Sequence, residues 1–414
     1  MKRYLQQTII LLSVVIILMF SSCSGMPIRL PAFPTSENPT QTTIEPSPQP
    51  LPTFEAPPQD TLLEWSPKLS EDYCRSGNSG QFSSLVFNSG AYYSVQSGDS
   101  RSVWRYLPDE ESGVKIAESL AEDGKFIEAL RVNDQWLVML IFDHPMHVQG
   151  WRVEVLNLET DDQQRLIDNI ETNENIVYLD MELQGNMLYF LTNTVTEGST
   201  QQLSTIQAFN LAEGTQEILL SSDSHLVYNQ MAISEKYLMI SQSPQGKDPN
   251  ADLPILFYSF ETQQLEELME ISGSYPLMSW PLAAWSEQGP NQFPETFKIF
   301  DFESSLSWPL QVQGEFPYSF DLSKKYLVWT ASSEPTSSFP AVFLISLDDG
   351  HKITVNTGSQ ELKPQFPQVR DDKLIFGLVR NYRSQDSQGM ICAIPLEDLQ
   401  TLSQPVSEVT PANP

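Results

Sequence analysis

The stretch Ser323-Lys-Lys-Tyr-Leu-Val-Trp-Thr330, a short polar turn followed by an apolar strand, has a counterpart in Ser234-Glu-Lys-Tyr-Leu-Met-Ile-Ser241. A turn and strand of this kind occurs seven times between about residues 81 and 405, with steps of 44 to 51 residues between equivalent positions. These positions are Tyr92, Leu137, Leu188, Leu238, Ala283, Leu327 and Leu374. A Leu or Phe that closes a later strand keeps the same phase, at Leu107, Leu158, Leu211, Phe260, Phe302, Leu347 and Leu396. The chain is therefore built from seven units of one kind.

Each unit contains four short stretches of strand character. In the sixth unit these stretches span residues 317–322, 326–330, 342–347 and 352–355. Strands joined by tight turns of Asp, Asn and Gly predict antiparallel hairpins. A period of 40 to 50 residues built from such strands predicts a β-propeller, because one four-stranded sheet cannot bury both faces alone and stacks on its neighbours. We expect an all-β fold, a seven-bladed β-propeller of four-stranded antiparallel blades, over residues 61–405.

Residues 1–22 have the features of an export signal. Lys2 and Arg3 form a basic start, and the apolar run Thr8–Phe20 is shorter than the roughly 20 residues that a transmembrane helix needs. The run ends at Phe20-Ser-Ser-Cys23, which resembles the lipobox of bacterial lipoproteins, although Phe20 and Ser22 depart from its commonest residues. The resemblance implies a signal peptide that is removed, a lipid on Cys23 and an extracytoplasmic, membrane-attached protein. A plain secretory signal is the alternative.

Residues 23–60 have the composition of a disordered tether. Ten prolines lie between residues 24 and 61, among Thr, Ser and Gln, so no core can form there. A polyproline-II-like chain rises about 3.1 Å per residue and could hold the folded part up to about 100 Å from a bilayer. Residues 406–414 show no periodicity and are expected to be a disordered tail.

The formal net charge of −30 limits the possible partners. A nucleic-acid-binding protein needs a basic surface, and docking on an anionic bilayer needs basic clusters, so we expect no nucleic acid and attachment to the membrane by the lipid alone. An acidic surface keeps an exported protein soluble and favours cations or basic partners, with an ordinary solvated surface as the alternative that the composition favours.

Two of the three cysteines lie near the two ends of the repeats: Cys74 precedes the first unit, and Cys392 lies in the last one. In a closed ring the two ends of the chain meet, and outside the cytoplasm such a pair would oxidise. We expect a possible disulfide between them, with two separate buried thiols as the alternative. Residues 61–66 have strand character and no unit of their own, so we expect them to join the seventh blade beside Met390–Leu396.

Long loops follow the second strand of most units: 192–203, 243–254, 287–295, 332–340 and 381–389. In a propeller they share one face, and binding residues concentrate on long loops of a rigid scaffold. The two stretches quoted first resemble the turn and strand of TolB-like propellers of exported bacterial lipoproteins, without that superfamily's Pro-Asp-Gly. This resemblance implies the fold and transfers no function.

Two stretches are candidate metal sites. Asp143, His144 and His147 place a carboxylate beside two imidazoles, which borderline metals accept. Asp248, Asn250 and Asp252 repeat oxygen ligands at alternate positions, as a calcium loop begins, but Leu253 replaces the turn glycine. Ordinary polar turns are the alternative for both stretches. We expect no cofactor, with calcium as the one candidate.

The sequence contains no G-x-S-x-G, H-E-x-x-H or phosphate-binding glycine loop. We therefore expect a non-catalytic, lipid-anchored extracytoplasmic propeller that binds a protein, peptide or glycan through the long-loop face. The alternative is a carboxylate-based carbohydrate-active enzyme, since the paired acids of a glycoside hydrolase can come from distant blades and leave no local motif. Two carboxylates that face each other in the central channel would favour that enzyme.

Overall fold

The computed structural model describes residues 60–405, except 109, 111, 121–125, 145–146, 169–174, 196–200, 224, 246–254, 267–272, 288–292, 313–314, 333–338, 382–383 and 385. This part of the chain contains two helices, α2 (Pro67–Tyr73) and α3 (Leu396–Leu402). Neither of them is long and apolar enough to cross a bilayer. All other regular structure in the described residues is β-strand.

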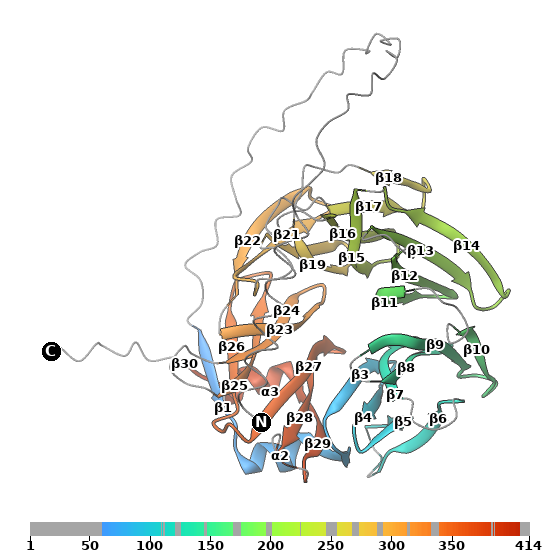
Figure 1. The fold of residues 1–414 in the computed structure, drawn as a ribbon. Coiled ribbons are helices and arrows are strands. Elements are labelled where there is room, and N and C mark those ends of the chain that lie inside the picture. The colour runs from blue at the N-terminus through green and yellow to red at the C-terminus, as the bar shows by residue number, and fades with distance from the viewer. Residues whose placement is uncertain are drawn as a thin grey trace, which may run out of the picture. The chain divides into compact units, whose positions relative to one another are not determined.

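Seven sheets, each built on four antiparallel strands, follow one another around a ring (Figure 1). The first four blades consist of β3 (Phe82–Asn88), β4 (Ala91–Gln96), β5 (Asp99–Tyr106) and β6 (Val114–Glu118); β7 (Phe126–Val132), β8 (Trp136–His144), β9 (His147–Asn157) and β10 (Gln163–Asp168); β11 (Asn175–Gln184), β12 (Met187–Val195), β13 (Gln202–Asn210) and β14 (Thr215–Ser221); and β15 (Leu226–Ile233), β16 (Tyr237–Pro244), β17 (Ile255–Ser259) and β18 (Gln264–Glu266).

The last three blades contain the remaining strands. They are β19 (Ser274–Ser279), β20 (Leu282–Ser286), β21 (Thr296–Asp301) and β22 (Leu306–Gln311); β23 (Glu315–Leu322), β24 (Tyr326–Ser332), β25 (Pro340–Ser346) and β26 (Lys352–Asn356); and β27 (Leu362–Arg370), β28 (Lys373–Arg380), β29 (Gln388–Pro395) and, from the start of the chain, β2 (Cys74–Ser79). The predicted fold, a seven-bladed β-propeller of four-stranded antiparallel blades, is confirmed.

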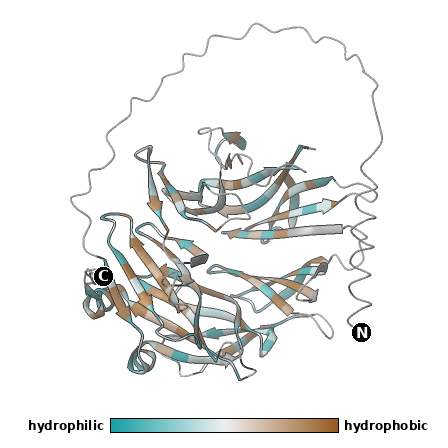
Figure 2. Ribbon diagram, turned by 60° about the vertical axis from the view of Figure 1, so that its left-hand side comes forward, coloured by the Kyte–Doolittle hydropathy of each residue, from teal (hydrophilic) through white to brown (hydrophobic). Residues whose placement is uncertain are grey.

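The hydrophobic core lies between neighbouring blades. One cluster joins Val138 and Val153 of the second blade to Phe190 and Phe209 of the third, and similar clusters lie between other pairs. Each second strand has neighbours within its sheet on both sides, which explains its largely apolar sequence and its regular recurrence. Figure 2 shows stretches of hydrophobic residues within the strands of the blades.

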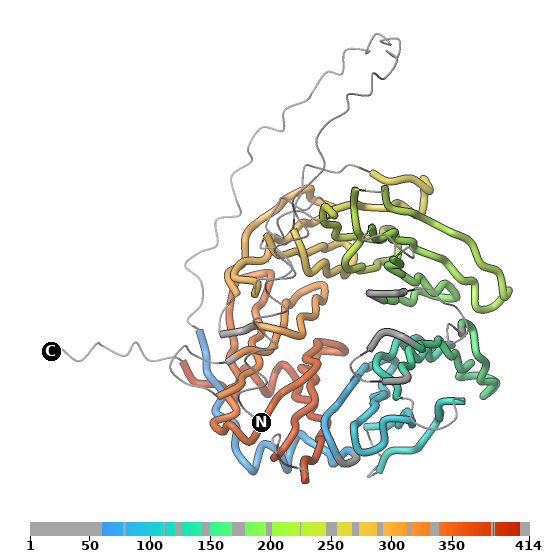
Figure 3. Tube along the Cα trace, in the orientation of Figure 1, coloured from blue at the N-terminus to red at the C-terminus, as the bar shows by residue number. Residues whose placement is uncertain are grey.

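The start of the chain closes the ring by completing the seventh blade. β2 pairs with β29 in an antiparallel register that places Cys74 opposite Cys392, and the two sulfurs are joined in a disulfide. From β2, the Arg75 guanidinium donates to the carbonyl oxygens of Leu107, Pro108 and Glu110 in the first blade. The beginning and the end of the described chain therefore hold each other, as the blue and red segments in Figure 3 show.

Two glycines allow close packing at this closure. The space that a Cβ at Gly77 or Gly389 would occupy lies only 2.9 and 2.0 Å from the side-chain nitrogen of Gln96 in the first blade. Any other residue at Gly389 would also come within 3.1 Å of the Gly80 carbonyl oxygen. The backbones of β2 and β29 can approach the first blade because neither residue has a side chain.

The prediction that residues 61–66 join the seventh blade is wrong. β1 (Thr61–Glu64) runs parallel to β26 at the outer edge of the sixth blade, and β30 (Gln404–Pro405) pairs with β1 on its other side. Helix α2 separates β1 from β2, and Trp65 packs edge-on against Phe376, with ring centroids 5.6 Å apart. The polar stretch Cys74–Ser79 has little strand propensity of its own, and its position depends on tertiary contacts such as those of Arg75.

We predict that the double substitution Cys74→Ser with Cys392→Ser lowers the free energy of unfolding by up to about 5 kcal/mol, because the crosslink closes a loop of several hundred residues in the unfolded chain. Urea unfolding of the two proteins measures the difference. Thiol titration of the denatured, unreduced wild type provides the check: two reactive thiols in addition to Cys23 would contradict the bond.

Candidate functional site

The first strands of the seven blades surround the centre of the ring (Figure 1), and each stands at the end of its sheet. They line a cavity of about 730 Å³. Every blade contributes to its wall, with Leu85 and Val86; Leu130 and Arg131; Asp180 and Glu182; 230–233; 275–278; 317–322; and 366–368 with Arg370. Of the described residues in the wall, Phe293 alone comes from a long loop between a second and a third strand.

Polar side chains in the first strands connect each blade to the next one. Among the contacts of the described residues, five of the seven junctions have a side-chain oxygen that accepts a hydrogen bond from a backbone N–H in the first strand of the following blade. The pairs are Ser84 with Leu130, Asp180 with Met231, Gln230 with Tyr275, Asp321 with Val369, and Gln368 with Phe87, at 2.9 to 3.4 Å. A first strand has a partner strand on one side only, so these side chains satisfy donors that would otherwise face the channel.

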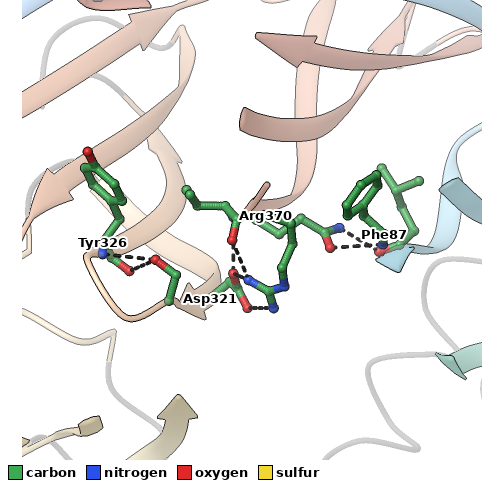
Figure 4. A network of polar contacts seen from close by, with 8 residues as sticks. Phe87, Asp321, Tyr326 and Arg370 are labelled. Atoms are coloured by element: carbon green, nitrogen blue, oxygen red, sulfur yellow. Dashed lines mark hydrogen bonds and ion pairs between the residues drawn. The ribbon is translucent and has the colours of Figure 1, made fainter. Parts of the chain in front are cut away.

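Two arginines reinforce this ring. Arg370 forms a bidentate pair with Asp321, at 2.7 and 2.9 Å (Figure 4), and also donates to the Val369 carbonyl. Arg131 lies in the corresponding place in the second blade, where it donates to the Leu130 carbonyl and forms a bidentate pair with Glu182, at 3.0 and 3.3 Å. Planar guanidinium groups fit such two-point pairing, which fixes the orientation of both partners.

Asp180 is in a different position from the other two acids of the channel. Its oxygens accept hydrogen bonds from the backbone N–H groups of Met181 and Met231, and Arg131 lies 3.9 Å away. Burial, together with the neighbouring Glu182 carboxylate, nevertheless raises the pKa of Asp180 to about 6. Among the described residues of the cavity wall, acidic side chains outnumber basic ones by one, because Asp180 and Glu182 share Arg131 while Asp321 is paired with Arg370.

Blades five to seven contain the same β-bulge in the first strand. Two consecutive residues stand opposite one residue of the second strand: Tyr275-Pro276 opposite Trp285, Ser319-Phe320 opposite Trp329, and Phe366-Pro367 opposite Phe376. The first residue of each pair has a positive φ, between 50° and 54°, which costs a residue with a Cβ about 1 kcal/mol or more. The first strands of blades one to four also insert one residue each, at positions 83, 128, 177 and 229, but none of these four residues has a positive φ.

The blades whose bulge contains a positive-φ residue give the channel wall a different surface from the other blades. On blades five to seven, ring and proline side chains form what we call the aromatic arc: Tyr275, Pro276, Phe293, Pro317, Tyr318, Phe320, Phe366 and Pro367. Bulges re-aim side chains, and backbone strain of this kind is characteristic of functional sites. On blades two and three the wall presents Arg131, Asp180 and Glu182.

Of the residues predicted from the sequence, the described part of the chain brings together Cys74 and Cys392, at the ring closure. Cys23 and the calcium candidates Asp248, Asn250 and Asp252 lie outside the described residues. Asp143, His144 and His147 lie at the turn between β8 and β9, and their side chains are not described. Within the described residues, no three His, Cys, Asp or Glu residues are placed to hold a metal ion. Both metal sites stay predictions.

The channel acids, the arginines and the aromatic arc were not predicted from the sequence. The long loops that were expected to bind a partner lie mostly outside the described residues. One signal was present: Pro276, Pro317 and Pro367 each interrupt a stretch of strand character. Proline inside a strand pattern indicates an edge strand or a bulge, and both are found here.

No protein-family model matches this chain, and no curated protein matches it. Among solved structures, a prolyl endopeptidase is similar over 77% of this chain and 50% of its own, with a TM-score of 0.54 and 8% identity. TolB from Acinetobacter baumannii is similar over 77% of this chain and 78% of its own, with a TM-score of 0.39 and 11% identity. An oligogalacturonate lyase in complex with manganese is similar over 75% of both chains, with a TM-score of 0.43 and 9% identity.

These comparisons agree with the fold and do not extend to function. At 8% identity, the likeness to the prolyl endopeptidase shows a shared fold alone. The likenesses to TolB and to the lyase, with TM-scores below 0.5, carry no functional argument. The chain is a seven-bladed β-propeller, and its function has to be inferred from its own residues.

We predict that the stability of Asp180→Asn relative to the wild type rises between pH 4 and pH 7. The folded wild type keeps a proton on Asp180 up to about pH 6, whereas the unfolded chain loses it near pH 3.8, so wild-type stability falls as the pH rises between these values. The relative gain for the variant between pH 4 and pH 7 is at most about 3 kcal/mol. Urea unfolding at both pH values measures it.

A second variant tests the cause of this pKa shift. Glu182→Gln removes the neighbouring negative charge, so the pKa of Asp180 should move back towards 3.8 and the loss of stability with rising pH should shrink. If Asp180→Asn lost stability with rising pH as much as the wild type does, the raised pKa could not belong to Asp180.

Proposed function

We propose that this protein is a non-catalytic binding propeller, exported and held at the outer side of a membrane by a lipid on Cys23, whose partner enters the central channel. The binding role is supported by one observation: the polar side chains of the channel are bonded to other parts of the protein, so they hold the scaffold together. Asp321 and Glu182 each accept a bidentate arginine, Asp180 accepts two backbone N–H groups, and Gln230 and Gln368 bridge blades.

The aromatic arc is the apolar part of the cavity wall, although Phe320 and Phe366 also pack on the inter-blade core. Binding sites are concave and mostly apolar, with a few polar groups that fix orientation, and a cavity of about 730 Å³ falls within the usual size range. The half-buried Tyr275, Tyr318, Phe320 and Phe366 are rigid amphipathic or apolar rings of the kind that provides most of the affinity at interfaces.

The proposed location has separate support. Residues 1–22 resemble a lipoprotein signal that ends at Cys23, and a proline-rich stretch follows. A disulfide between Cys74 and Cys392 is the chemistry of an oxidising compartment.

One observation favours the alternative of a carbohydrate-active enzyme. Asp180 and Glu182 occupy successive positions on one face of β11, and a carboxyl group with a raised pKa beside a second carboxylate is the arrangement of a glycosidase acid and its partner. Against it, both oxygens of Glu182 are bonded to Arg131. If the wild type hydrolysed an oligosaccharide and Asp180→Asn did not, the enzyme would be established and the non-catalytic binding role refuted.

We expect a photo-crosslinking residue placed at Phe320 or Phe366 to capture a discrete partner in intact cells. The matched controls are Ile218 and Leu265, which are 66% and 43% exposed on the outer strands β14 and β18. Gel mobility and mass spectrometry identify the adducts. The same products from all four positions, or none from the two channel positions, would argue against a partner in the channel.

We expect Cys23→Ser to release the protein from membranes with its thermal unfolding unchanged, because the lipid and not the acidic protein surface provides the attachment. Fractionation measures the release, with Met26→Ala as the control that stays attached. An unmodified Cys23 in the mature, membrane-bound protein would refute the anchor.

A further inference from the structure

From the charges and shape of the channel we infer the chemical class of its occupant: an extended peptide segment that inserts one lysine or arginine side chain, flanked by apolar residues. This inference rests on the proposed binding function. In it, the cationic head lies beside Glu182 and Asp180, and the apolar residues contact the aromatic arc.

The charge of the wall is the first argument. Of the described residues that line the cavity, three carry carboxylates, Asp180, Glu182 and Asp321, and two carry guanidinium groups, Arg131 and Arg370. Asp321 is matched one to one by Arg370, so the surplus negative charge lies with Asp180 and Glu182. A single positive charge on a ligand would balance the surplus negative charge of the channel, whereas a carboxylate on a ligand would add to it.

The shape and composition of the wall are the second argument. Tyr275, Tyr318, Phe320 and Phe366 line the cavity together with Pro276 and Pro367, and Tyr275 and Phe320 also contact each other. Lysine and arginine have long apolar stems that pack on such surfaces while the charged head reaches a polar group. A cation with an aliphatic stem therefore fits both the arc and the acid pair.

The third argument is the charge of the whole protein. With 53 acidic and 23 basic residues, the net charge of −30 repels acidic partners and raises the local concentration of basic ones. This long-range attraction is not selective for the channel, so the experiment must separate it from the contribution of the acid pair.

Asp180 makes the contribution of the pair measurable. The charged groups identified around it are Glu182 on its own strand and Arg131 on β7, and it also accepts the backbone N–H of Met231 on β15. Because the pKa of Asp180 is raised to about 6, its carboxyl is mostly protonated at pH 5 and mostly ionised at pH 7.5. A cationic ligand should therefore bind better at the higher pH.

The test compares two libraries of capped hexapeptides that differ only in one fixed internal residue, Lys or Gln, with the other positions randomised among Gly, Pro, Phe, Tyr and Leu. Retention on the immobilised, disulfide-bonded protein is measured at 0.15 M NaCl, where charges beyond about 8 Å are largely screened. We expect the wild type to retain the Lys library about tenfold better than the Gln library at pH 7.5, and to lose most of this preference at pH 5.

The variants locate the effect. Glu182→Gln should reduce the preference for Lys about as much as low pH does, whereas Glu217→Gln, which removes the same charge from the exposed outer strand β14, should leave it unchanged. An equal preference in both variants would mean that the surface charge alone attracts lysine, and would overturn the inference. Equal retention of the two libraries by the wild type would overturn it as well.

The test also separates this inference from the proposed function. If crosslinking from Phe320 and Phe366 captures a partner while lysine and glutamine peptides are retained equally, the binding role stands and the cationic occupant falls. The cationic occupant is also refuted if cellohexaose binds the wild type, fails to bind Tyr318→Ala and is indifferent to Glu182→Gln, because the occupant is then a glycan. The pH comparison needs no variant, so a folding defect in Glu182→Gln would not obscure the result.

Discussion

The structure depends on satisfying the inner edge of each sheet. The first strand of every blade stands at the end of its sheet and faces the channel, so its outward backbone N–H groups have no strand to pair with. An unsatisfied buried donor costs about 1 to 3 kcal/mol, whereas a formed hydrogen bond contributes about 0.5 to 1.5 kcal/mol. Ser84, Asp180, Gln230, Asp321 and Gln368 solve this problem by accepting such a donor from the next blade.

This solution also determines what the channel can do. The polar groups that hold the blades together are engaged with the scaffold, and the two arginines fix the acids in place. The junction between the fifth and sixth blades contains a ring contact between Tyr275 and Phe320, with centroids 6.1 Å apart. Here the wall becomes aromatic, and residues at the bulges of the fifth, sixth and seventh blades belong to this surface. The repeated blades therefore form a channel whose wall is charged on blades two and three and mostly aromatic on blades five to seven.

The sequence predicts the number of blades because the second strand of each blade is buried within its sheet and must be apolar at a regular spacing, as at Leu327 and Leu374. It does not predict the ring closure in full. Thr61–Glu64 has strand propensity but pairs with the sixth blade, while Cys74–Ser79 has little propensity and completes the seventh. Tertiary contacts decided both outcomes, and local propensity could not reveal them.

The candidate site was still less predictable. The inter-blade acceptors are Ser, Asp or Gln, since any short or medium side chain with an oxygen can fill the role, so no repeated motif marks them. Asp180 and Glu182 become a pair with Arg131 only when blades two and three pack together. Proline in the first strands, as at Pro276 and Pro367, was the one local sign of the bulges.

Hydrogen exchange of the inner-strand amides tests the central claim most directly. If side chains satisfy the inner edges, the amides of Phe87, Met231 and Val369 exchange slowly in the native protein, although each lies in a strand at the end of a sheet. In the variant Gln368→Ala, the Phe87 amide then exchanges much faster, while exchange of the Met231 amide is unchanged. Fast exchange of these amides in the wild type, at the rate of a solvent-exposed edge strand, would contradict the account.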